Sequence, residues 1–274
     1  MNYQERIVAY IDILGFSEKI RNTIKKNTKE EIESETNKIN NFFENIFETK
    51  RNKFQINNIE SSRMISNFSD SVVISYLLEE DDGIFHLFTD ILFLCITVLL
   101  DGYLIRGAIS SGKLHHSENN ESIIKLYGPA MLSAYDMGEN IAFYPRIIFE
   151  KEIFDIAEKY STKCSKKTEK FKDLNNLIKK DFDGLYYINY FSSIDYIFGA
   201  NDGQLVYLKA FKDKLIDLQK EINNNSVKSK YLWLKEKYNI AIKNLKRKYL
   251  NDNKIIECQK LYEYLFNERE INDE

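Results

Sequence analysis

Hydrophobic and polar positions in the first 80 residues change period several times, and each period predicts an element. Residues 5–14 are rich in Ile and Val and end at a glycine, which predicts a strand. Residues 16–50 are charged, with apolar positions at helical spacing, and predict one long helix or two consecutive ones. Short apolar runs at 64–68 and 72–77 flank Ser69-Asp70-Ser71 and predict a hairpin.

The pattern continues in the same style to about residue 150. A strongly apolar helix is expected over 81–100, and a strand over 103–110. A further short strand is expected at 123–127, a helix opening at Gly128-Pro129, and a strand at 146–149. The order β-αα-β-β-α-β-β-α-β predicts an α+β fold. We expect a ferredoxin-like or palm-type, mainly antiparallel sheet with helices on one face.

The sequence becomes Lys-rich and polar after this point, so we place an α+β domain at 1–160 and a mainly helical extension at 161–274. A strand is expected at 185–191 within the extension. From Leu205 on, apolar residues alternate in steps of three and four, with a break at 223–226, and predict a helical hairpin.

Charge, cysteine content and apolar runs limit the partners and the cellular location to be expected. The net charge of −3 gives no basic field to recruit nucleic acid, and the three cysteines are too far apart to form a disulfide framework or a zinc site. The N-terminus lacks a signal-peptide pattern, and the longest apolar run, at 91–100, is about half of what spans a bilayer. We therefore expect a cytoplasmic protein with no membrane segment.

One carboxylate stands in the apolar run AYIDILGFS: Asp12 lies where the first strand ends, and Asp70 lies at the hairpin tip. If the two strands are neighbours, these carboxylates meet although 58 residues separate them. With the carbonyl of Ile13 they would form an oxygen-only site for Mg²⁺ or Mn²⁺, of the two-metal kind that suits a nucleoside triphosphate. The plainer interpretation is a hydrogen-bonded Asp at a strand end and an ordinary turn residue.

Four motifs resemble the catalytic domain of class III nucleotidyl cyclases in order and spacing. They are IDILGF at 11–16, NFSDSVVISY at 67–76, LIRGAISSGKL at 104–114 and YGPAMLSAYDM at 127–137. The resemblance covers a little over half of the chain.

The resemblance implies that Asp12, Ile13 and Asp70 bind two metal ions. It also implies that Gly15 and Phe16 begin a helix whose backbone N–H groups face the phosphates. The 3′-hydroxyl of a nucleoside triphosphate would attack its own α-phosphate, giving a cyclic nucleotide and pyrophosphate. Sites of this family form between two chains, so a homodimer is implied. Bacterial signalling or phage defence is one setting in which such cyclases occur.

The sequence departs from the family at the residues that, in the family, orient the ribose, stabilise the transition state and read the base. The family's Asn and Arg, four and eight residues after the conserved Gly, are replaced by Leu132 and Asp136, and Asp136 would repel phosphate. Lys125 stands where many purine cyclases carry a base-reading Asp, and Arg63 lies one place from the expected base-reading Lys. Arg106 is the candidate catalytic cation, with Lys113 and Arg146 as the other residues able to supply the charge.

Two further functions stay open beside a divergent cyclase. Loss of the Asn/Arg pair favours a catalytically degenerate nucleotide-binding sensor or regulatory domain, and a related nucleotidyltransferase would share the metal geometry. His115-His116 is interpreted as a polar loop pair, Trp233 as a core or interface residue, and 243–248 (KNLKRK) as a solvated helix face.

Overall fold

The computed structural model describes residues 3–26, 28–48, 61–80, 82–118, 124–161, 177–191, 202–222, 224–251 and 263–264. The chain forms two compact units, Met1–Ile188 and Asn189–Glu274. The expected boundary at 160/161 falls at the end of helix α5 (Lys151–Ser161). The first unit extends further because two short strands beyond α5 pair onto its sheet. Cys164 and Cys258 lie outside the described residues.

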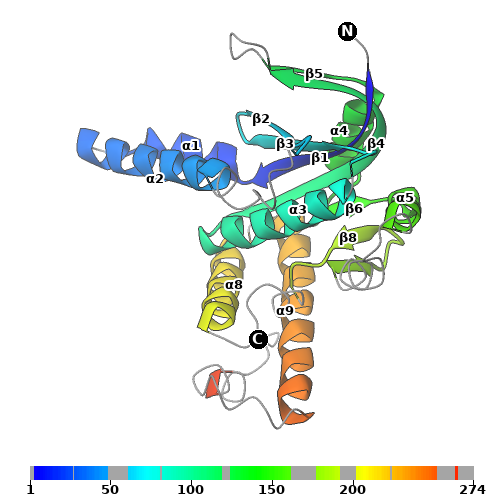
Figure 1. Ribbon diagram of the computed structural model, residues 1–274. Coiled ribbons are helices and arrows are strands. Elements are labelled where there is room, and N and C mark those ends of the chain that lie inside the picture. The colour runs from blue at the N-terminus through cyan, green and yellow to red at the C-terminus, as the bar shows by residue number, and fades with distance from the viewer. Residues whose placement is uncertain are drawn as a thin grey trace. The chain divides into compact units, whose positions relative to one another are not determined.

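Four strands make the centre of the first unit's sheet (Figure 1). They are β1 (Gln4–Leu14), β2 (Met64–Phe68), β3 (Ser71–Leu77) and β4 (Leu104–Glu118), and they lie in the order β2-β3-β1-β4. Every pair among them is antiparallel. With helices in both β-α-β crossings, this is the ferredoxin-like arrangement that the element order predicts.

Four short strands extend this centre. The strand β6 (Ile147–Phe149) pairs parallel to β4, and β8 (Tyr186–Ile188) and β7 (Ile178–Lys180) follow it antiparallel. The strand β5 (Ile124–Tyr127) pairs with the far end of β4. The sheet is therefore mixed, and the strand expected within 185–191 joins it as β8.

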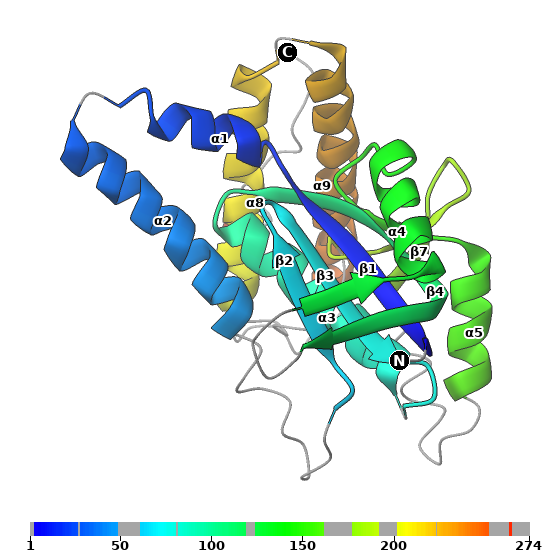
Figure 2. The same ribbon diagram turned by 90° about the horizontal axis from the view of Figure 1, so that it is seen from above.

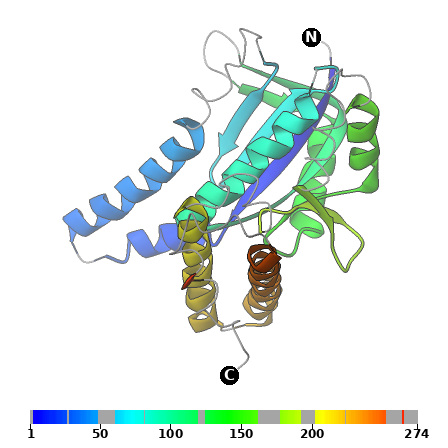
Figure 3. The ribbon, with the colours of Figure 1, turned by 60° about the horizontal axis from the view of Figure 1, so that its bottom comes forward.

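Helices cover both faces of the central strands. The hydroxyl of Tyr76 on β3 donates to Asp90 of α3 (Gly83–Leu100), so the face that carries Tyr76 is the α3 face, and Ile7 of β1 shares it by pairing with Tyr76. Figure 3 shows α3 lying across the sheet. This helix is apolar all round, which is typical of a buried helix. It is long and apolar enough to cross a membrane by composition, but 72% of it is buried inside the protein.

The opposite face carries α4 (Pro129–Asn140), which lies next to β1 and β4 (Figure 2). Its small residues Ala130 and Ala134 pack in one cluster with Val8 and Tyr10, which alternate with the residues facing α3. The α+β class is thus confirmed, and the helices occupy two faces of the sheet instead of the single face we expected. Helices α1 (Phe16–Thr23) and α2 (Lys29–Glu48) follow β1 in sequence.

The second unit contains the expected helical hairpin, formed by α8 (Asp202–Lys220) and α9 (Asn225–Asn251). Its core is aromatic: Phe211 packs against Phe191 and edge-on against Tyr238. Trp233 is buried and meets Phe191 edge-on, as a core residue does.

Candidate functional site

Asp12 lies near the end of β1 with one partner on each side. In the register of the sheet it is opposite Ser71 on β3 and Arg106 on β4. Directly paired residues of antiparallel strands point to the same face. Asp12, Ser71 and Arg106 therefore lie on the α4 face.

The structure brings Asp70 to the same end of β1. Phe68 pairs with Ser71, so Ser69 and Asp70 form a two-residue turn, with Ser69 at φ +54°. The backbone N–H of Ile13 donates to the carbonyl of Asp70 at 3.0 Å. The turn residue and the strand-end carboxylate, 58 positions apart in sequence, are thus neighbours in space.

Arg106 bridges Asp12 to a third carboxylate. Its Nε donates to Oδ2 of Asp12 at 3.0 Å, and its second terminal nitrogen donates to Oε2 of Glu139 at 2.8 Å. Glu139 belongs to the last turn of α4. The side chains of Asp12, Arg106 and Glu139 are 15%, 20% and 30% exposed, so the bridge is shielded from water without being sealed from it.

Tyr10 holds Glu139 from the sheet side. Its hydroxyl donates to Oε1 of Glu139 at 2.9 Å and lies 3.1 Å from the hydroxyl of Ser71. The ring fits because residue 138 is glycine: a Cβ there would stand 2.7 Å from the Cδ1 atom of Tyr10. Gly138 therefore lets α4 approach closely enough for Glu139 to reach the ring hydroxyl and the guanidinium together.

The electrostatics follow from this crowding. Burial raises the pKa of Asp12, and the charges of Asp70 and Glu139 raise it further, while the hydrogen bond and charge of Arg106 oppose the rise. Burial alone would lower the pKa of Arg106, but Asp12 and Glu139 outweigh it and raise the pKa. Burial and the charge of Glu139 also raise the pKa of Tyr10, so its hydroxyl stays a donor. Asp12 and Glu139 thus share the Arg106 guanidinium, and the charge of Asp70 acts on Asp12.

Asp12 and Asp70 supply carboxylate oxygens, which are the donors that Mg²⁺ prefers in proteins. Among the described residues no group of three or more His, Cys, Asp or Glu side chains is arranged to hold a metal by itself. Mg²⁺, however, is commonly bound by one or two carboxylates and completed by substrate phosphates and water. Beside Asp12, Arg106 supplies a positive charge, and Asp70 and Glu139 supply negative ones.

The turn after β1 starts a helix beside the carboxylates. Gly15 has φ +78°, a left-handed conformation that glycine adopts without strain, and α1 begins at the next residue. The side chain of Phe16 is buried, edge-on to Phe43 at 5.5 Å. Phe16 can therefore offer a substrate only its backbone.

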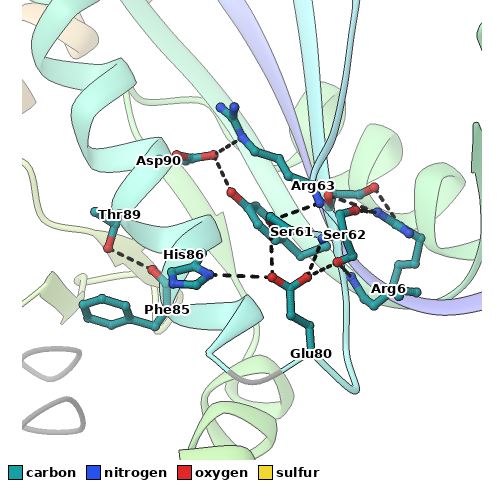
Figure 4. Close-up of polar contacts among 12 residues, drawn as sticks. Arg6, Ser61, Ser62, Arg63, Glu80, Phe85, His86, Thr89 and Asp90 are labelled. Atoms are coloured by element: carbon teal, nitrogen blue, oxygen red, sulfur yellow. Dashed lines mark hydrogen bonds and ion pairs between the residues drawn. The ribbon is translucent and has the colours of Figure 1, made fainter. Parts of the chain in front are cut away.

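The structure does not bring Arg63 together with Asp12. The Nε of Arg63 donates to Asp90 of α3 at 2.7 Å, the same carboxylate that accepts from Tyr76, so this side chain lies on the α3 face (Figure 4). Beside it, Glu80 accepts from Ser62 and faces His86 (Figure 4). In this chain Arg63 anchors the start of β2 to α3.

The other expected cations are also elsewhere. Lys125 lies on β5 opposite Ser117, eleven residues along β4 from Arg106, and Lys113 pairs in register with Glu5. Arg146 is fully buried and ion-paired with Asp181 at 2.5 Å and with Asp183. Of the candidate cations, Arg106 alone contacts Asp12 within the described residues.

Leu132 and Asp136 both lie on the exposed side of α4, and Leu132 is 64% exposed. Neither contributes to the buried side of the helix, which packs through Ala130, Ala134 and Met137.

The expected histidine loop is in fact the continuation of β4, which runs to Glu118. His116 is buried, its ring nitrogens 2.6 Å from the hydroxyl of Ser66 and 2.9 Å from that of Ser75. The loop interpretation was wrong because the polar run after Gly112 hides a strand that pairs with β5.

Sequence reasoning missed Glu139 and Tyr10. Tyr10 reads as one more apolar strand residue, and Glu139 reads as a helix-terminal charge. Their contact depends on where α4 crosses β1 and β4, which no local pattern encodes.

No family model and no curated protein matches the sequence. Several solved structures are similar to the chain. The catalytic core of a rhodopsin-guanylyl cyclase with converted specificity, in complex with ATPαS, is 11% identical with a TM-score of 0.45, over 69% of this chain and 96% of that one. The guanylate cyclase domain of RhGC from Catenaria anguillulae, in complex with GTP, is 12% identical with a TM-score of 0.41, over 57% and 83%. The adenylyl cyclase CyaB from P. aeruginosa is 13% identical with a TM-score of 0.39, over 68% and 94%.

Proposed function

We propose that this chain is a divergent, metal-dependent nucleotidyl cyclase that converts a nucleoside triphosphate to a cyclic nucleotide and pyrophosphate. The observation that carries the proposal is that Asp70 lies beside the end of β1 that carries Asp12, because the backbone N–H of Ile13 donates to the carbonyl of Asp70 at 3.0 Å. The four sequence motifs that resemble class III cyclases supply the reaction class, and two of them contain these residues.

Asp12, Asp70 and the Ile13 carbonyl would hold the divalent ion. When bound, the metal lowers the pKa of the attacking 3′-hydroxyl and offsets phosphate charge. Asp12, near the end of β1, and Asp70, in the turn between β2 and β3, would fix the position of that chemistry. The free backbone N–H groups at the start of α1 would receive phosphate oxygens, as helix N-termini do for anions.

Arg106 is the residue of this chain that would stabilise the negative charge developing on the α-phosphate. Its guanidinium lies beside Asp12 and offers donors in a planar fork, which suits phosphate oxygens. Glu139 and Tyr10 orient it from α4 and from β1. We also infer a homodimer, because in the resembling family the site forms between two chains.

The test incubates the protein with each of the four nucleoside triphosphates and Mn²⁺ or Mg²⁺. Turnover is measured by pyrophosphate release, and the products are identified by mass spectrometry. Asp70→Asn should lower cyclic product formation by about 100-fold, the order of magnitude that a positioned metal ion supplies. Asp155→Asn is the matched control, since this exposed aspartate lies on α5 and pairs only with its helix neighbour Lys151 in the described structure. Equal turnover in the Asp70 variant and the wild type would overturn the metal site. A linear oligonucleotide product would instead identify a nucleotidyltransferase.

A second function is favoured by Leu132 and Asp136. With an exposed leucine and an acid at the positions where the family carries Asn and Arg, the chain would bind nucleotide without turning it over and act as a sensor or regulatory subunit. Nucleotide binding that requires Mn²⁺ and is lost in Asp70→Asn, with no product from any of the four nucleotides, would establish this function in place of catalysis.

A further inference from the structure

Arg106 faces Asp12 at the point where a metal ion would bind. It is opposite Asp12 in the β1–β4 register, and its Nε donates a hydrogen bond to Oδ2 of that carboxylate at 3.0 Å. A metal ion bound through this oxygen would therefore lie beside a positively charged guanidinium. The repulsion between the two cations disfavours a metal ion at this oxygen while Arg106 keeps its place.

Glu139 holds Arg106 in this place together with Asp12. One terminal nitrogen donates to the Glu139 side chain at 2.8 Å and another to the Glu139 carbonyl at 3.4 Å. Glu139 is itself fixed by the hydroxyl of Tyr10 at 2.9 Å. The guanidinium thus has partners on β1 and on α4, and its position is built into the packing of that helix on the sheet.

The charges around this point balance one divalent ion. Asp12, Asp70 and Glu139 carry three negative charges, and Arg106 carries one positive charge, which leaves a net charge of −2. One divalent cation neutralises that charge, and a second would have to approach a guanidinium a few ångströms away. Like charges at such a distance disfavour each other, all the more where water is partly excluded.

Resting on the function proposed above, we propose that Arg106 takes the place of one of the two cations, so that this site binds a single divalent ion per chain. Glu139 and Tyr10 are positioning residues that keep the guanidinium against Asp12. The chain then differs from a two-metal cyclase in its cation set as well as in Leu132 and Asp136.

The experiment counts Mn²⁺ ions bound to the full chain by the loss of the free-ion electron paramagnetic resonance signal. We expect one Mn²⁺ per wild-type chain and two per Arg106→Gln chain, because the variant frees Oδ2 of Asp12 and removes the positive charge. Arg106→Lys keeps the charge and should stay at one, whereas a purely structural role of the guanidinium predicts that it behaves like Arg106→Gln. Lys113→Gln removes a charge elsewhere on β4 and should also bind one ion.

Two wild-type ions, or an Arg106→Gln chain that still binds one, would overturn this inference and leave the proposed cyclase untouched. No Mn²⁺ bound to wild type or to Arg106→Gln would overturn the metal site and the inference together. The wild-type count requires no substitution, so the inference is tested even if Arg106→Gln fails to fold. Thermal unfolding of each variant establishes which of the counts refer to folded protein.

Discussion

His116 should make the stability of the first unit depend on pH, and its surroundings set the size of the effect. The ring is 4% exposed, with Ser66 and Ser75 at its two nitrogens. Arg6 donates its Nε to the hydroxyl of Ser75, so a fixed positive charge stands one residue away from the ring. Burial lowers the pKa of His116 from the ordinary 6.5 to about 4, and the charges of Arg6 and His115 add to the shift.

The sign follows from which state takes up the proton. Between pH 6.5 and pH 4 the unfolded chain carries a protonated histidine and the folded chain a neutral one. The unfolded state therefore gains protons first, and the free energy of unfolding falls as the pH is lowered through this window. A shift of this size corresponds to a loss of about 2.5 kcal/mol between pH 7.5 and pH 4.5.

Urea unfolding followed by far-ultraviolet circular dichroism at a series of pH values measures this loss. His116→Gln should be less stable at pH 7.5, yet its free energy of unfolding should fall by about 2.5 kcal/mol less than that of the wild type on acidification. His115→Gln, which changes the partly exposed neighbour, is the matched control and should keep most of the wild-type dependence, because the charge of His115 is the smallest of the three causes. Fluorescence of Trp233 is a poor probe here because that residue belongs to the second unit. Identical pH dependence of wild type and His116→Gln would refute a buried, neutral His116.

Other substitutions test the packing around the site. Gly138→Ala should cost about 1–3 kcal/mol of unfolding free energy, because its Cβ would stand 2.7 Å from the Tyr10 ring; a melting temperature equal to the wild type would contradict the close approach. Arg146→Met should cost about 3–5 kcal/mol, since it leaves the carboxylates of Asp181 and Asp183 together without their shared cation, and denaturant unfolding measures it. Leu132→Asn combined with Asp136→Arg should change stability by no more than about 0.5 kcal/mol and should raise cyclic product formation if the missing pair limits turnover; unchanged turnover would show that another step is limiting.

The central fold was predictable because its signals are local and repeated. The strand before Gly15, the hairpin around Ser69-Asp70 and the apolar helix over 81–100 are each specified by period and turn residues, and their order fixes the ferredoxin-like topology. The second face of the sheet was missed because α4 buries small residues, Ala130 and Ala134, which give no strong apolar stripe. The full length of β4 was missed because its last four residues, His115–Glu118, are polar and pair with the short strand β5.

The proximity of Asp12 and Asp70 could be predicted because both residues lie at element ends, where the sequence marks the position. The cations could not be placed, because each depends on tertiary pairing. Arg63 was expected near the base-reading position and Arg146 as an alternative to Arg106. Instead Arg63 is bound to Asp90, and Arg146 is paired with Asp181 and Asp183. A buried or half-buried arginine is found beside the carboxylates that its strand register and its helix neighbours supply, and a single sequence does not reveal that register.

The contact of Arg106 with Asp12 depends on the exact register between β1 and β4. Side chains along a strand point alternately to opposite faces, so an arginine at 105 or 107 would face α3, away from Asp12. Gly107 fixes the alignment, since a Cβ there would stand 2.0 Å from the carbonyl of Tyr10, and β4 can therefore approach β1 closely only with glycine at this place. The pairing of Gly107 with Ile11 then sets Arg106 opposite Asp12. The cation beside Asp12 is thus set by one strand pairing, and we expect a substitution of Arg106 to change Mn²⁺ binding before it changes the fold.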